Sequence, residues 1–237
     1  LSAADGSMDM QQISIFGKPV WSEQTLTVNG REIPAKQNGW QLLHTNASLP
    51  MTLSSSMPWQ IGFINIERPG RGVTVSAMGI NGAQLSQWSK WRPGMWEDLA
   101  QTKADLIILA YGTNEAFSGN LDISSTERTW RNYIRQIKNT LPNAGILILG
   151  APESLKTAYG SCGNRPVLLS EVQQMQQRIA RDEKIMFWSW QDAMGGACSM
   201  KNWMAQGLAA KDGVHFSAQG YETAADKLAD SLIRFAQ

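Results

Sequence analysis

Short apolar segments alternate with turn-forming residues along the first third of the chain. Clusters of Gly, Pro, Asn and Ser separate the stretches MQQISIF (10–16), TLTVNG (25–30), MTLSSS (51–56) and WQIGFINIE (59–67). Brief segments of this kind, bounded by turn residues, are typical of strands in all-β units. We therefore predict that residues 1–74 are a β-rich segment, part of a β-sandwich or jelly roll.

From residue 73 onward the pattern changes to an alternation of strands and helices. Buried strands are predicted at VTVSAMG (73–79), DLIILAYG (105–112), ILILGAP (146–152) and IMFWSW (185–190). Helices are predicted over residues 82–91, 95–102, 124–140 and 168–182, followed by a closing helix that begins after Ser217. Ser124 and Glu127 have the spacing of a capping box. The closing helix carries an apolar face of Tyr221, Ala224, Ala225, Leu228, Leu232 and Ile233.

This alternation predicts an α/β domain over residues 75–237, with a parallel sheet covered by helices on both faces. In such sheets, ligands bind at the carboxyl ends of the strands. Two loops of unusual composition follow predicted strands, MGINGA (78–83) and YGTNEAF (111–117). We expect both loops at the edge of the sheet where ligands bind.

The charge and composition exclude several classes of function. The formal net charge is +1, and the scattered Lys and Arg form no basic stripe for nucleic acid or anionic membranes. The longest apolar runs are too short to span a bilayer. Two His and two Cys are too few for a credible Cys/His zinc cluster. Residues 1–10 contain neither an apolar signal core nor Met at position 1, so we expect a processed, trimmed or partial chain.

The two cysteines, Cys162 and Cys198, lie in Gly-rich segments. A disulfide between them would close a long loop and add roughly 3 to 4 kcal/mol to stability. Two unconnected thiols are equally compatible with the sequence, so both alternatives stay open.

One candidate for acid–base chemistry is the pair Asp212 and His215, in DGVHFSAQGY. A carboxylate can hold the tautomer of a histidine and stabilise the imidazolium that forms when the histidine acts as a general base. An isolated Asp-x-x-His is nevertheless more often accidental than functional. The other histidine, His44 in WQLLHTN, has no such neighbour, and we interpret it as structural or exposed on the surface.

Candidate oxyanion donors lie in the two polar loops. The carboxamide of Asn114 could donate to a developing negative charge, while Gly112 allows a sharp turn and a close approach of substrate. The backbone N–H of Gly82 could likewise point at an anion. Ordinary turn chemistry at both places is the alternative.

Ten tryptophans are a high count for this length. Trp88, Trp91, Trp96 and Trp130 fall in predicted helices, and we expect them to pack in the core. Trp188, Trp190 and Trp203 precede the Asp212 turn and are candidates for the walls of a substrate cleft.

Taken together, GINGA, YGTNEA and DGVHFS resemble the second, third and fifth sequence blocks of the SGNH (GDSL-like) hydrolases. Within that superfamily, the motifs most closely resemble those of the peptidoglycan O-acetylesterases: AMGINGAQ, LAYGTNEAF and DGVHFSAQGY. These are extracytoplasmic bacterial enzymes with a β-rich, carbohydrate-module-like insertion. Glu115, where the superfamily usually has Asp, fits this narrower group. The resemblance covers roughly residues 73–237 and implies a flavodoxin-like, three-layer α/β/α fold.

The resemblance also implies roles for the matching residues. His215 would be the general base and Asp212 its orienting partner, and Gly82 and Asn114 would donate to the oxyanion. The implied reaction is Ser-His-Asp acyl transfer that removes acetyl groups from an O-acetylated cell-wall glycan, in the periplasm or outside the cell. Such a reaction needs no metal or organic cofactor, and we expect none.

One family feature is missing from the sequence. The nucleophilic Ser of the family lies in a Gly-Asp-Ser block after the first strand, and no Gly-Asp-Ser occurs here. Asp5-Gly6-Ser7 follows no apolar strand, and ISIFGKP (13–19) has Lys18 and Pro19 where Asp and Ser belong. Neither stretch is a convincing substitute.

The first strand of that fold lies inside the sheet, in the order 2-1-3-4-5. Full burial of each of its roughly five apolar residues would stabilise the fold by about 1.5 to 3 kcal/mol. The total is comparable to the free energy of unfolding of a whole domain, about 5 to 15 kcal/mol. We therefore expect this strand and its Ser on an N-terminal segment of the same parent protein.

Two other functions stay open. The chain could belong to an SGNH esterase or acyltransferase that acts on another polysaccharide or a small ester. It could also be a catalytically inactive glycan-binding scaffold, an alternative that the missing Ser favours and the retention of Asn114, Asp212 and His215 opposes.

Overall fold

The computed structural model describes residues 1, 6, 8–21, 24–91 and 93–236. The chain divides into two compact units, Leu1–Met78 and Gly79–Gln237. The predicted boundary, after residue 74, falls slightly earlier. Asp5 and Ser7, considered above as a remnant of the nucleophile block, lie outside the described residues.

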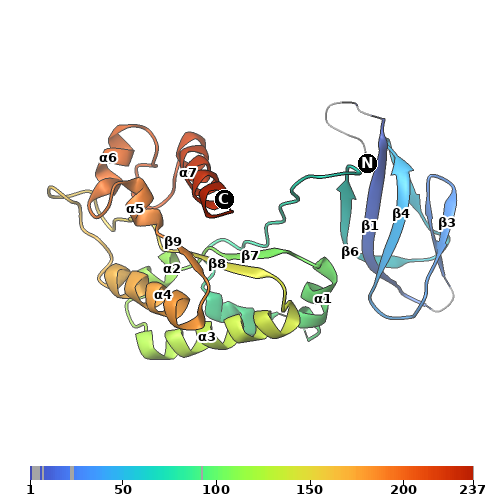
Figure 1. Cartoon of the computed structure of the whole chain (residues 1–237), viewed down its shortest axis with the longest axis horizontal. Coiled ribbons are helices and arrows are strands. Elements are labelled where there is room, and N and C mark those ends of the chain that lie inside the picture. Colours follow the sequence, from blue (N-terminus) through green and yellow to red (C-terminus); the bar gives the residue numbers. More distant parts are fainter. Residues whose placement is uncertain (2–5, 7, 22–23, 92, 237) are drawn as a thin grey trace. The chain divides into compact units, whose positions relative to one another are not determined.

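The first unit contains two antiparallel sheets in its described part (Figure 1). One has the order β4-β1-β6, from β1 (Met10–Pro19), β4 (Gln41–Ser48) and β6 (Trp59–Glu67). The other has the order β3-β2-β5, from β2 (Thr25–Val28), β3 (Arg31–Pro34) and β5 (Leu53–Ser54). The prediction missed β3 and β4, the strand that carries His44. Lys18 and Pro19, at the end of β1, pair with β6.

Alternation of apolar and polar residues gives these sheets a shared core. Ile13 and Ile15 of β1 point to the same side and are buried against Leu26 and Val28 of β2 and Leu43 of β4. Because successive side chains of a strand point to opposite faces, the residues between them face outward. Ser14 and the exposed His44 lie on this outer face, where the Oγ of Ser14 lies 3.0 Å from the Nδ1 of His44.

The second unit is built on a parallel sheet with the order β7-β8-β9 in its described part. The strands are β7 (Leu106–Leu109), β8 (Gly145–Leu149) and β9 (Met186–Trp188). The helices are η1 (Leu85–Lys90, a 3-10 helix), α1 (Met95–Thr102), α2 (Thr113–Phe117), α3 (Ile123–Thr140), α4 (Leu169–Glu183), α5 (Trp190–Met194), α6 (Ser199–Ala205) and α7 (Ala218–Ala236). The predicted helices over 95–102 and 168–182 agree with α1 and α4 to within one residue at each end.

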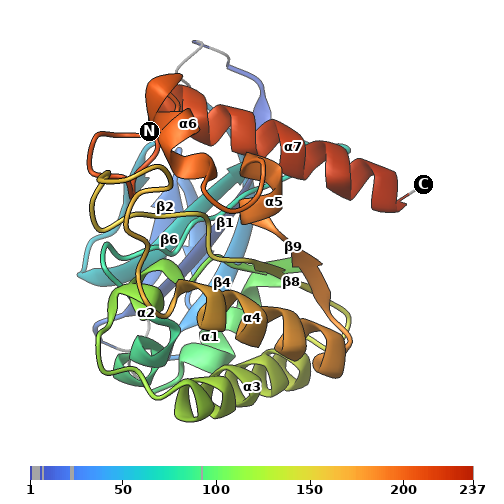
Figure 2. The same ribbon diagram turned by 90° about the vertical axis from the view of Figure 1, so that its left-hand side faces the viewer.

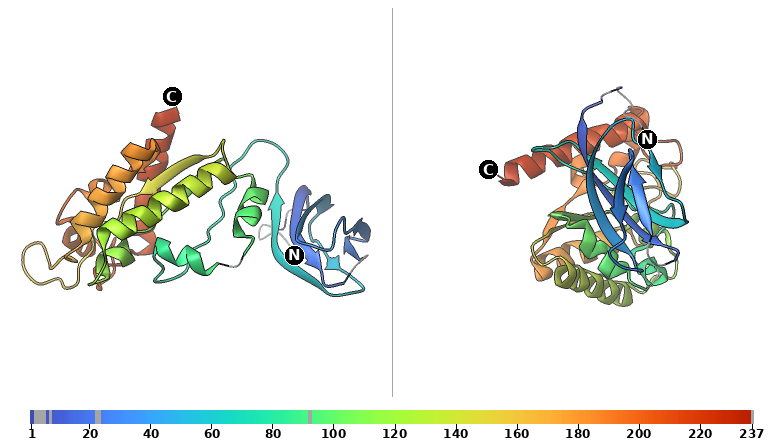
Figure 3. Two further views of the ribbon diagram at one scale, coloured as in Figure 1. Left: turned by 90° about the horizontal axis from the view of Figure 1, so that it is seen from below. Right: turned by 90° about the vertical axis from the view of Figure 1, so that its right-hand side faces the viewer.

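Helices cover both faces of this sheet. Helices α3 and α4 lie side by side on one face (Figure 3), and α7 lies on the other (Figure 2). The apolar stripes of α3 and α4 enclose a core with β8, in which Trp130, Ile134, Val172 and Met175 are fully buried. Burial on both faces explains why β8 is a continuous apolar run rather than an alternating one.

Two predicted strands differ from the structure. Residues 72–80 form neither helix nor strand, and Val73 and Val75 are 91% and 86% exposed. An extended segment becomes a strand only when a neighbour supplies hydrogen-bond partners, and no strand lies beside it among the described residues. For the same reason β7 is an edge strand here, and its Ile108, expected to be buried, is 43% exposed.

The predicted capping box at the start of α3 is also wrong. The cap is Asp122, whose Oδ1 accepts hydrogen bonds from the N–H groups of Ser124 and Ser125. Because the helix begins at Ile123, Ser124 already lies in its first turn. Glu127 instead forms an ion pair with Arg131 within α3 and a second with Arg178, which joins α3 to α4.

Candidate active site

Asp212 and His215 form a hydrogen-bonded pair in a tight turn between α6 and α7. The Nδ1 of His215 lies 2.8 Å from the Oδ2 of Asp212. The Oδ1 of Asp212 accepts hydrogen bonds from the N–H groups of Val214 and His215, at 2.8 and 3.0 Å. Gly213 takes a positive φ of 71°, which closes the turn and favours glycine at that position. The spacing Asp-x-x-His therefore supplies both members of the pair locally.

These hydrogen bonds fix the chemistry of the pair. The His215 side chain and the two N–H groups lower the pKa of Asp212 from 3.8 to about 2, so its carboxylate is ionised at neutral pH. A carboxylate only accepts hydrogen bonds, and the proton of a neutral imidazole is therefore assigned to Nδ1. The Nε2 atom of His215 is left as an acceptor, on a side chain that is 72% exposed.

The turn is attached to the segment that follows β8. The backbone N–H of Leu155 donates a hydrogen bond of 2.8 Å to the carbonyl of Gly213. A Cβ atom at Gly213 would lie only 3.0 Å from the Cβ of Leu155. Ser217 then caps α7, as predicted, because its Oγ accepts a hydrogen bond from the N–H of Gly220.

Asn114 lies at the carboxyl end of the neighbouring strand, β7, in the first turn of α2. Its Nδ2 donates a hydrogen bond of 2.9 Å to the carbonyl of Ala83, next to Gly82. The Nε2 of Gln84 donates back to the carbonyl of Asn114 at 3.2 Å. A primary amide has two N–H bonds, so one remains available to a ligand.

Gly82 is the third residue of a turn closed by a hydrogen bond from the N–H of Ala83 to the carbonyl of Ile80. Its φ of 75° is a conformation that favours glycine at this position of a turn. Within the described residues, no protein group accepts a hydrogen bond from its own N–H. This N–H is therefore free to bind a ligand near the carboxamide of Asn114.

Gln176 of α4 joins the ends of β7 and β8. Its Nε2 donates to the carbonyl of Tyr111, and its Oε1 accepts from the N–H of Ala151. The loop of Asn114 follows the carboxyl end of β7, and the Leu155 segment that holds the Asp212 turn follows the carboxyl end of β8. Both therefore leave the sheet at the carboxyl ends of its strands. Figure 1 shows α2 and α5 at this end of β7 and β8.

Comparison with known proteins identifies the family. Residues 60–223 match the model of the GDSL-like lipase/acylhydrolase family, which is more than half of the chain. The chain belongs to this family. No curated protein matched.

Solved structures agree with the family. A peptidoglycan O-acetylesterase is 64% identical with a TM-score of 0.93, and the match covers 99% of this chain and 67% of that one. An acetyl xylan esterase (16% identity, TM-score 0.52, 65% and 78% covered) and a Bacillus subtilis protein (13% identity, TM-score 0.52, 97% and 79% covered) share the fold. Membership of the GDSL-like family, together with the first of these structures, makes the chain a carboxylic-ester hydrolase.

The tryptophans of this GDSL-like hydrolase differ partly from expectation. Trp88 and Trp130 are buried as predicted. Trp203, expected in a cleft wall, is 4% exposed, and its Nε1 donates to the carbonyl of Met194 inside a small core cluster. It is buried because α5 and α6 fold back on each other, which a local pattern does not reveal. Trp190 stacks on Phe216, with ring centroids 5.3 Å apart.

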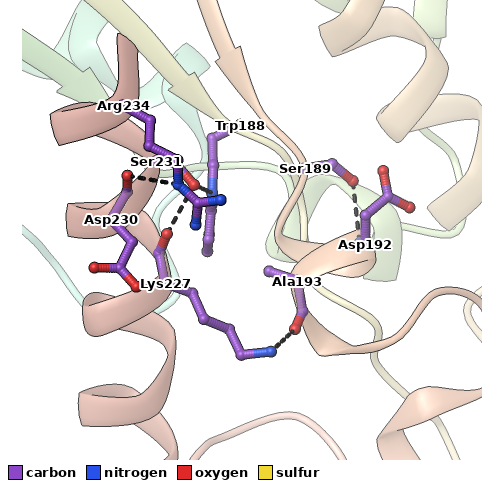
Figure 4. Close-up of a pocket in the computed structure, with 8 residues that line it drawn as sticks. All are labelled: Trp188, Ser189, Asp192, Ala193, Lys227, Asp230, Ser231 and Arg234. Atoms are coloured by element: carbon purple, nitrogen blue, oxygen red, sulfur yellow. Dashed lines mark hydrogen bonds between the residues drawn. The ribbon is translucent and has the colours of Figure 1, made fainter. Parts of the chain in front are cut away.

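Trp188 lines a cavity of about 350 Å³ between β9, α5 and α7 (Figure 4). Its Nε1 donates to the Oγ of Ser231, and the Nζ of Lys227 donates to the carbonyl of Ala193 across the cavity. None of Gly82, Asn114, Asp212 and His215 lines this cavity. Trp188 therefore lines a cavity apart from these four residues, and its place in a substrate cleft stays a prediction.

Of the two alternatives for the cysteines, the structure has the disulfide, Cys162–Cys198. It attaches the loop after β8 to the start of α6. Beside it the fully buried Glu153 pairs with Arg165 and accepts from the N–H of Cys198. Among the described residues, no group of three His, Cys, Asp or Glu is placed to hold a metal, and no helix is long and apolar enough to cross a membrane.

Proposed function

We propose that this GDSL-like hydrolase removes O-acetyl groups from peptidoglycan through Ser-His-Asp acyl transfer. The observation that carries the proposal is the Asp212–His215 pair, whose turn is held by the segment that follows β8, while Asn114 follows the neighbouring strand β7. The choice of substrate is supported by the 64% identity with a peptidoglycan O-acetylesterase. This substrate also favours an extracytoplasmic location.

In the proposed mechanism the Oγ of a serine attacks the acetyl carbonyl while the Nε2 of His215 takes its proton. Asp212 holds the imidazole and stabilises the imidazolium. The N–H of Gly82 and the second N–H of Asn114 stabilise the oxyanion of the tetrahedral intermediate. The imidazolium returns the proton to the departing sugar oxygen. Water, deprotonated by the same imidazole, then releases acetate and the serine.

We place the nucleophilic serine on an N-terminal segment of the same parent protein. Four observations support this placement. The chain lacks a Gly-Asp-Ser block, and it spans 67% of the peptidoglycan O-acetylesterase structure. Strand β7 has a partner on one side only among the described residues. Residues 73–79 are an extended and exposed segment with the sequence of a strand. A strand between residues 73–79 and β7 would restore the order 2-1-3-4-5.

We further propose that the antiparallel unit, Leu1–Met78, is part of a carbohydrate-module-like insertion that follows the Ser segment. Its two antiparallel sheets around one core are consistent with this assignment.

Acetate release from O-acetylated peptidoglycan by the intact enzyme tests the proposal. We expect faster turnover of O-acetylated peptidoglycan than of acetylated xylan. A small aryl acetate, which carries no glycan, should report the chemical step without glycan binding. His215→Ala should abolish release from all three substrates. The matched control is His44→Ala, which removes the other histidine and should leave release unchanged. Equal release by wild type and His215→Ala would disprove the mechanism, and a preference for xylan would disprove the substrate.

A further inference from the structure

Glu115 is a buried carboxylate next to Asn114. Its side chain is 1% exposed, and burial raises its pKa. In the part of the chain that the structure describes, no Lys or Arg forms an ion pair with it. An unpaired buried charge is costly, and an uncharged residue would avoid this cost. Through Gly112 this side chain caps α2, so its other partner decides whether it does more than stabilise that helix.

The two oxygens of Glu115 bind two different loops. Oε2 accepts a hydrogen bond of 2.9 Å from the N–H of Gly112, at the start of α2. Oε1 accepts a hydrogen bond of 2.9 Å from the N–H of Leu85, in the segment that follows Gly82. The side chain thus connects the loop of Asn114 to the loop of Gly82.

The same two loops are also joined by direct hydrogen bonds, but these are weaker than the bonds of Glu115. The bond from Asn114 to the carbonyl of Ala83 and the bond from Gln84 to the carbonyl of Asn114 are partly exposed, so water competes for their donors and acceptors. Both bonds of Glu115 are buried. Hydrogen bonds shielded from water are the stronger kind, so those of Glu115 dominate the connection.

Only a carboxylate satisfies both donors. A glutamine has one acceptor oxygen and one NH₂ donor, so it could accept from Gly112 or from Leu85 but would oppose the other N–H. An aspartate keeps two acceptor oxygens but is one methylene shorter, so it cannot reach both N–H groups without movement of a loop.

We propose that Glu115 is a positioning residue that fixes the spacing between the N–H of Gly82 and the carboxamide of Asn114. This inference rests on the proposed function, because it matters only if these groups bind an oxyanion. Glu115 touches no substrate and acts through the two donors. Oxyanion donors must lie about 2.7–3.1 Å from the oxygen they stabilise, so a small displacement lowers turnover more than substrate binding.

The test is steady-state hydrolysis of 4-nitrophenyl acetate by the intact enzyme, well below the melting temperature of every variant. We expect Glu115→Gln to lower kcat by about 10- to 100-fold, less than complete loss of one oxyanion donor, with KM within about twofold. Glu115→Asp should recover part of kcat, because it restores the second acceptor. Ile137→Val, a fully buried change near the end of α3, is the control for destabilisation and should keep wild-type kcat.

A double variant separates positioning from general damage. In an Asn114→Ala background, Glu115→Gln should lower kcat by less than about threefold, because residues that act through one site are not additive. If Glu115→Gln lowered kcat as much in the Asn114→Ala background as it does in the wild type, the inference would be overturned. It would also be overturned if Glu115→Gln kept wild-type kcat while its melting temperature fell. Should Glu115→Gln not fold, wild-type kcat in Glu115→Asp would overturn it equally.

Failure of the proposed function has a different signature. A wild-type enzyme without activity, or an Asn114→Ala variant with full activity, would reject the proposed function. An active wild type that loses turnover in Asn114→Ala but not in Glu115→Gln would reject only the positioning role of Glu115.

Discussion

The Nδ1 of His215 lies 2.8 Å from the Oδ2 of Asp212, so the carboxylate holds the imidazole with its Nε2 pointing away. Asp212→Asn replaces this acceptor with a group that can donate, which favours the wrong tautomer of His215. We expect kcat to fall by about 10⁴-fold, with little change in KM. Asp226→Asn, an exposed change on α7, is the control. Retention of more than a tenth of wild-type kcat by Asp212→Asn would show that the pair is not catalytic.

The same hydrogen bonds make stability depend on pH. They lower the pKa of Asp212 to about 2 in the folded protein, below its ordinary value of 3.8. The ionised carboxylate therefore stabilises the fold above about pH 4, and this contribution is lost as the pH falls toward 2. Asp212→Asn should lower the melting temperature at pH 6 and have progressively less effect between pH 4 and pH 2. A constant difference over this range, measured by circular dichroism, would contradict the shift.

Asn114→Ala removes one proposed oxyanion donor. We expect kcat to fall by about 100- to 1,000-fold, because the donor acts mainly in the transition state. Asn120→Ala, at an exposed turn beyond α2, is the matched control and should keep wild-type kcat. If the two variants hydrolysed aryl acetate equally fast, Asn114 would have no part in the chemistry.

The disulfide Cys162–Cys198 braces the loop after β8, the same segment that holds the Asp212 turn. Replacing both cysteines by serine should lower the free energy of unfolding by about 3–4 kcal/mol, from the entropy of the loop that the bond closes. Urea unfolding measures this difference. A reducing agent should destabilise the wild type and leave the double variant unchanged, and an insensitive wild type would contradict the prediction.

The sequence predicted the parts of the fold that depend on local pattern. Helix α4 was predicted to within one residue and the start of strand β8 likewise, because a stripe of 3.6-residue period and a short apolar run are strong local signals. The Asp212 turn was recognisable for a similar reason. Its spacing brings the carboxylate to the imidazole without help from distant residues.

The sequence failed where a distant partner decides the structure. Residues 73–79 alternate like a strand, yet a strand needs a neighbour, and the described residues supply none. Trp203 is buried by the packing of α5 and α6. Glu115 was noted only as a variation on a family pattern, because its link to Leu85 crosses thirty positions of the chain.

The most direct test of the account is a crystal structure of the intact enzyme labelled with a serine-directed phosphonate. We predict a phosphonylated serine on the N-terminal segment, with its Oγ within about 2.6–3.2 Å of the Nε2 of His215. The phosphoryl oxygen should lie about 2.7–3.1 Å from the backbone N of Gly82 and the Nδ2 of Asn114. A labelled serine within residues 1–237, or a phosphoryl oxygen held by other groups, would contradict the account.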